Sequence, residues 1–283
     1  MKDIALGQYF EGTSLLHRID PRIKLFSAFL LIVALFTAKS LWCFLFLTAL
    51  VLLLVAFCGV PLRMILGGLR PLIFVLFVTV FISAFLTKGE GDPLVSLSVF
   101  GWVRLEVYYE GLVRAGLLAL RILLLVISTG IFLTYTTTPT TLTDALERVL
   151  HPLTYLRIPV YDFAMMMTIA LRFIPTLVEE TDRIMCAQKA RGADFASGSL
   201  FRRIRALVPI IIPLFVSAFR RAVELATAME CRCYRGGTGR TRLHKMRYHT
   251  RDWFFLLFFV VCLALVILGN VYLPTKISMG GMA

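Results

Sequence analysis

Acidic residues and histidines are scarce in this sequence. Its 283 residues include 17 Asp and Glu against 30 Lys and Arg, with only four histidines. The resulting net charge of +13 favours an anionic membrane face or an acidic protein partner. The chain is also 59% hydrophobic, whereas soluble domains are about 45–50% apolar. We therefore expect an integral membrane protein that does not bind nucleic acid.

The same scarcity disfavours an enzyme embedded in the bilayer. Such an enzyme needs paired acids, or a Ser/His or His/Glu set, at bilayer depth. The histidines all fall at positions that we predict to be cytoplasmic: His17, His151, His244 and His249. A self-contained channel is disfavoured as well, because the apolar stretches lack the polar stripe of a pore. We expect a protein without catalysis of its own.

Several sequence signals are also missing. The six cysteines do not suggest a disulfide framework, because Cys43, Cys58 and Cys262 lie in apolar stretches where a thiol behaves as a small hydrophobe. The polar start 1–24 runs into a membrane segment without the small-residue pattern of a cleaved signal peptide. No G-x-x-x-x-G-K-[ST] motif occurs, so we expect this chain to bind neither ATP nor another cofactor.

Five stretches are apolar enough to cross a bilayer, which takes about 20 residues. Only Lys39 and Ser40 separate the first two, which predicts a tight hairpin. The predicted spans are 21–38, 41–60, 69–87, 112–135 and 253–273. We therefore expect an all-α membrane protein with about five transmembrane helices.

Basic residues are distributed unevenly between the connecting segments. Of the 30 Lys and Arg residues, 24 fall within 1–24, 61–70 and 139–252. Basic connections remain on the cytoplasmic side of a membrane. The distribution therefore predicts a cytoplasmic N-terminus and an external C-terminus.

The basic segment 139–252 contains two further apolar stretches, 158–178 and 207–219. The first carries two charges and a proline, and the second is short, with Pro209 and Pro213 expected to interrupt a helix. We therefore predict long amphipathic helices on, or partly in, the inner face of the membrane. The alternative is that both stretches cross the bilayer.

Local signals place helices within this segment. Thr141 and Asp144 can cap a short helix that Pro152 ends. A second helix is predicted through 177–190, and apolar residues at three- and four-residue steps over 215–229 predict a third. The chain then divides into 1–138 with four spans, 139–252 with cytoplasmic or interfacial helices and 253–283 with the last span.

Smaller features carry their own predictions. Asp20 and Pro21 suit the N-cap and first position of a helix, and Lys24 is placed to snorkel to the inner headgroups. Arg121 lies inside the fourth span, where we expect a structural pairing with a carboxylate or with helix carbonyls. Alternation over 95–107 suggests a small external hairpin.

The stretch AMECRCYRGGTGRT at 228–241 combines cysteines, arginines and glycines. Cys231 and Cys233 are two apart and point in different directions on a helix, and no second Cys/His pair has zinc-ligand spacing, so we expect no metal site. The glycines do not form a phosphate loop. We expect Gly236 or Gly237 to supply the left-handed residue that ends the helix.

That leaves the arginines. Arg232 and Arg191 are 41 residues apart, and each is predicted near the C-terminal end of a long helix, between small residues. The helix dipole favours a cation there, and a guanidinium can bridge a carboxylate with two parallel hydrogen bonds. One such arginine is most often simply solvated. A pair of them in a basic segment suggests that each arginine inserts into one of two similar binding sites on a partner.

Four stretches carry a resemblance to a known family. They are SLLHRIDPRIKL at 14–25, YYEGLVRAGLLALRILLLV at 108–126, TTPTTLTDALERVLHPL with MMMTIALRFIPTLVEETDRIMCAQKARG from 137 to 192, and AMECRCYRGG at 228–237. In this order and spacing the chain resembles the T component, the transmembrane coupling subunit, of energy-coupling factor transporters. The resemblance extends from about residue 8 to about residue 240.

The resemblance implies a function for the arginines. A T component in the plasma membrane of a prokaryote joins two ABC-type ATPases, which hold ATP and Mg²⁺, to a substrate-binding S component that is often interchangeable. Arginines of two X-Arg-X motifs dock into the ATPases. Carried over, the docking residues are Ala190, Arg191, Gly192, Cys231, Arg232 and Cys233. The second motif departs from the family in having cysteine in place of alanine before the arginine.

Three methionines mark a second candidate contact. Met165, Met166 and Met167 fall on a segment that the resemblance places beside the S component, and methionine repacks easily against different partners. Ordinary packing is the alternative for them. For the whole chain, the two functional hypotheses are a subunit for vitamins or other micronutrients and a T component dedicated to a cobalt or nickel system.

Overall fold

The structure is a computed structural model that describes residues 10, 12, 14–86, 95–99, 103–193, 195, 199–236 and 249–272. Within these residues the elements are helical apart from one two-stranded hairpin, so the expected all-α architecture is confirmed. The chain divides into two compact units. The bundle unit comprises Gly7–Leu142 with Met246–Ala283, and the α6–α7 unit comprises Met1–Leu6 with Thr143–Lys245.

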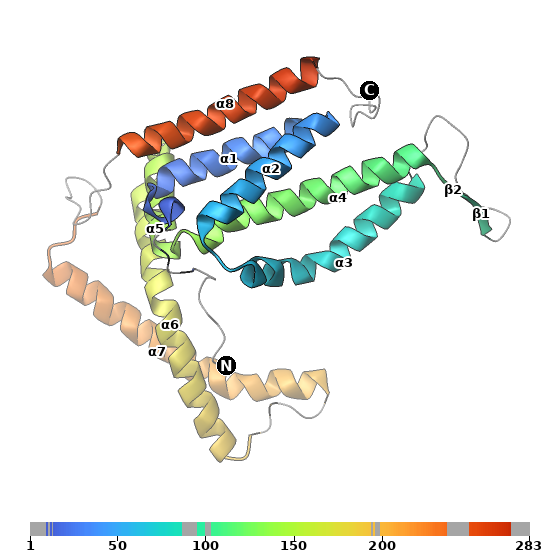
Figure 1. The fold of residues 1–283 in the computed structure, drawn as a ribbon. Coiled ribbons are helices and arrows are strands. Elements are labelled where there is room, and N and C mark those ends of the chain that lie inside the picture. Colours follow the sequence, from blue (N-terminus) through green and yellow to red (C-terminus); the bar gives the residue numbers. More distant parts are fainter. Residues whose placement is uncertain are drawn as a thin grey trace. The chain divides into compact units, whose positions relative to one another are not determined.

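The bundle unit is built from long apolar helices (Figure 1). They are α1 (Pro21–Thr37), α2 (Leu41–Cys58), α3 (Leu62–Leu86), α4 (Tyr109–Thr129) and α8 (Thr250–Tyr272), with a short 3₁₀ turn η1 (Leu15–Arg18) and a π-helical turn η2 (Gly130–Tyr135) that extends α4. In this unit α1 packs against α8, and α3 packs against α4. The predicted tight turn between α1 and α2 is confirmed, because residues 38–40 alone separate the two helices.

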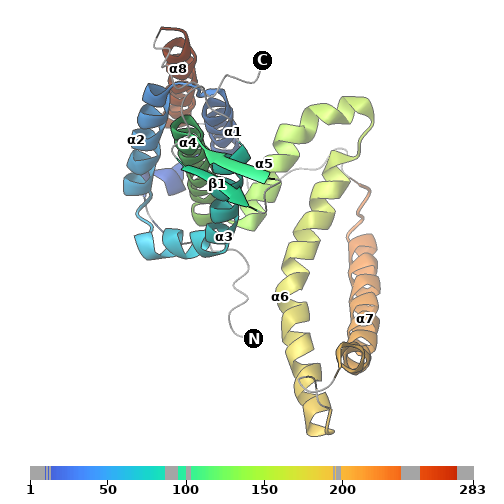
Figure 2. The ribbon, with the colours of Figure 1, turned by 90° about the vertical axis from the view of Figure 1, so that its right-hand side faces the viewer.

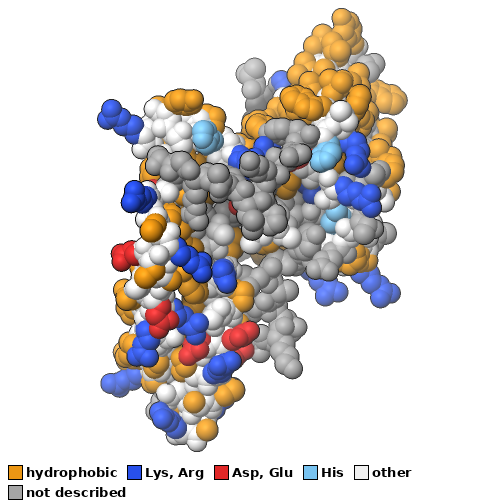
Figure 3. All heavy atoms as spheres, turned by 90° about the vertical axis from the view of Figure 1, so that its left-hand side faces the viewer, with side chains coloured by type: hydrophobic (Ala, Val, Ile, Leu, Met, Phe, Trp, Pro, Cys, Tyr) orange, Lys and Arg blue, Asp and Glu red, His pale blue; other side chains and the backbone are white. Residues whose placement is uncertain are grey.

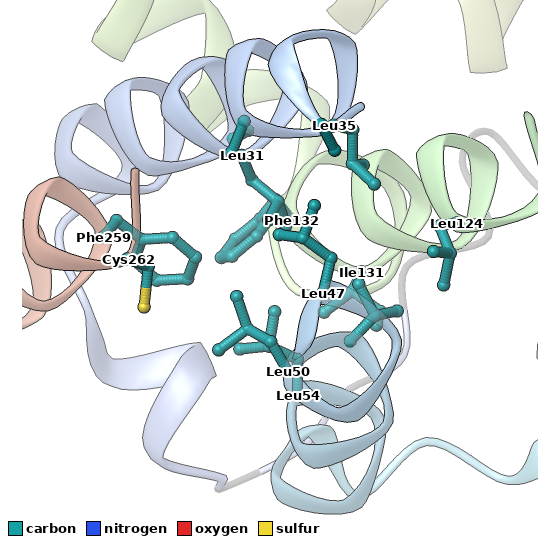
Figure 4. Packing of buried hydrophobic residues seen from close by; sticks show 14 of the residues in the cluster. Leu31, Leu35, Leu47, Leu50, Leu54, Leu124, Ile131, Phe132, Phe259 and Cys262 are labelled. Atoms are coloured by element: carbon teal, nitrogen blue, oxygen red, sulfur yellow. The ribbon is translucent and has the colours of Figure 1, made fainter. Parts of the chain in front are cut away.

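The core of the bundle unit lies where α1, α2, η2 and α8 meet (Figure 4). Leu31 of α1 and Leu47 of α2 are almost fully buried there. The Phe132 ring packs edge-on against Phe259 with centroids 5.6 Å apart, which is a favourable geometry for aromatic pairs. In contrast, large apolar side chains are exposed along α8, at the top of Figures 1 and 3, as expected of a lipid-facing surface.

Capping and turn residues explain several boundaries. The Asp20 carboxylate accepts the Arg22 N–H, and Pro21 is the first residue of α1, which confirms the predicted start. The predicted hairpin over 95–107 is also present, as β1 (Val95–Val99) pairs antiparallel with β2 (Val103–Val107). However, α3 begins at Leu62, seven residues before the predicted span at residue 69, because the apolar residues of LRMILGG at 62–68 extend the helix.

Arg121 and Lys24 are both held inside the bundle unit. The Arg121 guanidinium donates to the Ala38 carbonyl at 2.6 Å and lies 5.1 Å from the centre of the Phe44 ring, which confirms the pairing with a helix carbonyl. The prediction that Lys24 snorkels is wrong. Its side chain is 2% exposed, and its ammonium donates to the Thr136 carbonyl at 2.8 Å.

The α6–α7 unit contains the C-terminal part of α5 (Pro139–Leu150), the 3₁₀ turn η3 (His151–Leu156), α6 (Val160–Ala190) and α7 (Leu200–Cys231). Helix α6 packs against α7 (Figure 2). The short helix ends at Leu150 as predicted, but its cap is Thr138, whose hydroxyl accepts the Thr141 N–H at 3.3 Å.

The expectation that prolines interrupt the third coupling helix is wrong. Pro209 and Pro213 both lie inside the continuous helix α7, as Pro175 lies inside α6. A proline removes one backbone donor and pushes on the preceding turn, which kinks a long helix whose flanking turns remain hydrogen-bonded. Figures 1 and 2 show that α7 is bent along its length.

Six helices in the described part of the chain are long and apolar enough to cross a membrane: α2, α3, α4 with η2, α6, α7 and α8. Helix α1 has 17 residues. The chain is therefore a multi-pass membrane protein. Helices α6 and α7 are as long and apolar as the other candidate spans. Composition therefore does not decide whether they lie at the inner face of the membrane or cross it.

Candidate functional site

The first predicted docking motif, Ala190–Arg191–Gly192, forms a regular C-cap at the end of α6. Arg191 is the cap residue, with φ −85° and ψ 6°, and Gly192 follows in the left-handed region with φ +86°. The Gly192 N–H donates to the Lys189 carbonyl at 3.0 Å, and the Ala193 N–H donates to the Gln188 carbonyl at 3.0 Å. These two bonds define a Schellman motif, which satisfies carbonyls that a helix end otherwise leaves open.

The second triplet ends α7 with the same motif. Arg232 is the cap residue, with φ −89° and ψ 14°. The Cys233 N–H donates to the Glu230 carbonyl at 2.9 Å, and the Tyr234 N–H donates to the Met229 carbonyl at 3.0 Å. Both arginines therefore occupy the same position of the same backbone structure, which their sequence spacing alone does not establish.

The left-handed residue of the second motif is not the predicted glycine. Cys233 has φ +56°, whereas Gly236, with φ +85°, follows three residues later, and Gly237 lies outside the described residues. A side chain in the left-handed region costs about 1–2 kcal/mol, so the chain accepts strain at this point. The six candidate docking residues are all exposed: Ala190, Arg191, Gly192, Cys231, Arg232 and Cys233.

The electrostatics of both ends favour an anionic partner. Each guanidinium lies at the C-terminus of a helix of about 30 residues, where the helix dipole stabilises a cation. Within the described part of the chain, neither Arg191 nor Arg232 pairs with a carboxylate. A methyl group added at Gly192 would meet no atom within 4 Å, so the surface there is open to a partner.

An ion pair joins the two helices at equivalent distances from their ends. The Arg221 guanidinium lies 3.4 Å from the Glu180 carboxylate. Glu180 precedes Arg191 by 11 residues, and Arg221 precedes Arg232 by 11. At 1.5 Å per residue, each arginine extends about 16 Å beyond the contact. Sequence analysis missed this pair. Glu180 and Arg221 are 41 residues apart, as Arg191 and Arg232 are, and this equal spacing could have indicated it.

A cavity of about 470 Å³ lies between α6 and α7, next to the ion pair. Its lining is mainly apolar and includes Phe173, Leu225 and Met229, with Tyr234 at the end of the second motif. Outside it, large apolar side chains remain exposed among the charges of the α6–α7 unit, as the lower left of Figure 3 shows. Apolar surface of this extent indicates contact with lipid or protein.

The three methionines lie in the N-terminal half of α6. Met166 is 61% exposed and Met167 is 39% exposed, whereas Met165 is half-buried. Among the described residues, no group of three or more His, Cys, Asp or Glu side chains is placed to hold a metal ion. His244 lies outside those residues.

The fold and these helix ends define a class of multi-pass membrane protein with two long helices that each present a terminal arginine. Over residues 12–243 the chain matches the family described as CbiQ, cobalt transport protein. It also matches curated proteins that are each named energy-coupling factor transporter transmembrane protein EcfT. One, from Ruminiclostridium cellulolyticum, is 46% identical over 252 residues, covering 89% of this chain and 91% of the relative.

Two further relatives with this name match nearly their whole length. The protein from Clostridium kluyveri is 44% identical and covers 96% of this chain and 98% of the relative. The protein from Bacillus subtilis is 42% identical and covers 94% of this chain and 98% of the relative. The chain therefore belongs to the EcfT/CbiQ family, which confirms the resemblance inferred from its motifs.

Proposed function

We propose that this chain is the transmembrane coupling subunit of an energy-coupling factor transporter. It joins two cytoplasmic ABC-type ATPases to a substrate-binding S component, for uptake of vitamins or other micronutrients. The carrying observation is the repeated Schellman end, in which Arg191 and Arg232 hold the same exposed backbone position. Two ATPases of one class offer two similar binding grooves, and two helix ends of the same backbone geometry suit them.

The docking chemistry follows from the geometry of these ends. A guanidinium at a helix C-terminus carries a full charge on a rigid support, and it can form two parallel hydrogen bonds with one carboxylate. Small neighbours, Gly192 in one end and the two cysteines in the other, let a concave surface approach closely. This chain supplies no catalytic group of its own, and ATP and Mg²⁺ belong to the ATPases.

The arrangement of α6 and α7 suggests how a movement is transmitted. When ATP binding and hydrolysis close and open the ATPases, the two ends move with them. The Glu180–Arg221 contact lies about 16 Å of helix from each end and acts as the point about which the helices turn. The apolar faces of the two helices then move against the S component, with Met166 and Met167 exposed for that contact.

This function requires a cytoplasmic position for both helix ends. We therefore propose that the N-terminus is cytoplasmic, that the C-terminus is external, and that α6 and α7 lie at the inner face of a prokaryotic plasma membrane. The high share of basic residues in 139–252 supports this orientation. Anionic lipids at that face are a further partner of the segment.

A subunit dedicated to cobalt or nickel is the second candidate. The matched family is described as a cobalt transport protein, whereas the three relatives above carry names without a metal. The substrate site belongs to another chain in either case. Genes beside this one decide between the two: a shared subunit is encoded with two ATPases alone, and a dedicated one with its own metal-binding S component.

Arginine substitutions test the proposed docking. Truncating one member of a buried charge pair costs about 2–5 kcal/mol, so Arg191→Ala or Arg232→Ala should each weaken retention of the ATPases during purification. Lysine in either position should restore retention only in part. The double alanine variant should lose both the ATPases and uptake while accumulating normally in the membrane. If it still retains the ATPases, the proposed docking is wrong.

A further inference from the structure

From residue 10 onward, where the structure describes the chain, it crosses between its two units twice, and both crossings are tied to one short stretch. It leaves the bundle unit after Leu142, and the described chain is again part of that unit from His249. Before the first crossing, the Lys24 ammonium donates to the Thr136 carbonyl at 2.8 Å. After the second, the Asp252 carboxylate accepts the Asp20 N–H at 3.3 Å.

Additional bonds reinforce each side. On the first side, the Phe10 N–H donates to the Tyr135 carbonyl at 3.2 Å, next to the carbonyl that Lys24 holds. On the second side, Asp252 also accepts the His249 N–H at 2.9 Å. One stretch of five residues at the start of α1, from Asp20 to Lys24, therefore holds the Thr136 carbonyl on the first side and the Asp252 carboxylate on the second.

The charges in this stretch are deeply buried. Lys24 and Asp252 are each 2% exposed, Arg22 is 6% exposed and Asp20 is 8% exposed. The two acids and two bases balance in charge, and Arg22 lies 3.9 Å from the Asp20 carboxylate. Burial of charges, even when they are paired, is at best weakly stabilising compared with apolar side chains of similar size. Such a set is better explained by the geometry it imposes than by the stability it adds.

The backbone that Lys24 holds is unusual. The π-helical turn η2 ends at Tyr135, and the Phe132 carbonyl accepts hydroxyl bonds from both Thr136 and Thr137. This π-helical turn ends α4, and its hydrogen bonds, from residue i to i+5, replace the regular α-helical pattern just before Thr136. Without Lys24, this segment could unwind when the helices that follow it are displaced.

We infer that Lys24 and Asp252 are positioning residues for coupling, an inference that rests on the proposed function. They fix both crossing segments to α1, so that the bundle unit anchors α6 and α7 while their apolar faces move against the S component. Without them, local unwinding near Thr136 and His249 absorbs the displacement. ATP hydrolysis then continues with little uptake.

The test compares uptake with ATP hydrolysis in the assembled transporter. Lys24→Met and Asp252→Asn are purified with their ATPases and a riboflavin-binding S component and placed in lipid vesicles, with radiolabelled riboflavin as the probe. Lys39→Met is the matched control, because Lys39 is an exposed lysine beyond the other end of α1. We expect riboflavin taken up per ATP hydrolysed to fall about 2- to 30-fold in both variants and to be unchanged in the control.

The ratio separates coupling from folding. If uptake and hydrolysis fall together, or neither changes, the inference is overturned. If Lys24→Met does not accumulate, Asp252→Asn decides the question, since it keeps the size and one acceptor of the aspartate. Hydrogen exchange provides a second readout: amides at 136–142 and 249–252 should exchange faster in both variants, and unchanged exchange contradicts the inference.

Failure of this inference is distinguishable from failure of the proposed function. The Lys24 and Asp252 variants should retain both ATPases, because their docking arginines are intact. If the Arg191→Ala, Arg232→Ala double variant retains the ATPases as well, the proposed function is wrong. If that variant loses them but the riboflavin-to-ATP ratio of the Lys24 and Asp252 variants is normal, only the inference about positioning is wrong.

Discussion

At the scale of single residues, the two helix ends differ in one respect. The left-handed position is a glycine after Arg191 but a cysteine after Arg232. Glycine adopts this conformation without strain, whereas a side chain with a Cβ atom does so at a cost. The chain therefore accepts strain at Cys233 so that Arg232 is presented in the same way as Arg191.

Substitutions of Cys233 test that reading. Cys233→Gly should retain the second ATPase contact, with stability within about 1 kcal/mol of the parent, because relief of strain offsets the added freedom of glycine. Cys233→Val should lose at least about 1 kcal/mol, because a β-branched residue is poorly accommodated at positive φ. Thermal unfolding and ATPase retention measure both effects. Equal behaviour of the two variants would contradict the account.

Arg121 provides a second test at this scale. Its guanidinium satisfies the carbonyl of Ala38, a residue with no exposed surface. Arg121→Met leaves that carbonyl without its donor and should destabilise the protein by about 1–3 kcal/mol. The control on the same helix is Arg114→Met, which removes a partly exposed pair with Glu110 and should cost about 0.5 kcal/mol or less. Unfolding midpoints in detergent compare the two.

At the scale of elements, the Glu180–Arg221 pair links α6 to α7. Both side chains are about a third exposed, so solvent screens their attraction. A double-mutant cycle with Glu180→Gln and Arg221→Gln should give a coupling energy of about 0.2–1 kcal/mol in thermal unfolding. The packing of α6 on α7, and not this pair, then holds the two helices together. A coupling energy of several kcal/mol would show that the pair is the main connection.

Sequence patterns predicted the helices whose signals are local. The start of α1 follows from its Asp-Pro cap, and the pairing of Arg121 follows from the cost of an unpaired cation in an apolar span. The errors arose where distant segments decide the outcome. Lys24 is buried because the Thr136 carbonyl, 112 residues away, accepts a hydrogen bond from its ammonium. The prolines of α7 remain helical because long flanking turns support them.

The sequence predicted which residues form the candidate site but not their backbone geometry. The motif spacing indicated Arg191 and Arg232, and the small residues beside them. It did not indicate that both arginines are cap residues of Schellman motifs, since the expected left-handed glycine was placed three or four residues too late. A cysteine rarely adopts positive φ, so no sequence rule points to Cys233.

At the scale of the whole molecule, the account depends on which side of the membrane the helix ends face. In a variant with the six native cysteines replaced by serine, Gly192→Cys should resist a membrane-impermeant thiol reagent in intact cells and react after permeabilisation. Lys39→Cys, in the predicted external hairpin, should react in intact cells. Reaction of Gly192→Cys in intact cells would place the end of α6 outside, as the two-crossing arrangement requires.

The most direct measurement is a structure of this chain assembled with its two ATPases and an S component. The account predicts that guanidinium nitrogens of Arg191 and of Arg232 each lie within hydrogen-bonding distance of a carboxylate, one on each ATPase, at about 2.7–2.9 Å. If either guanidinium faces bulk water, away from both ATPases, the claim that two equivalent helix ends couple this protein to the ATPases is wrong.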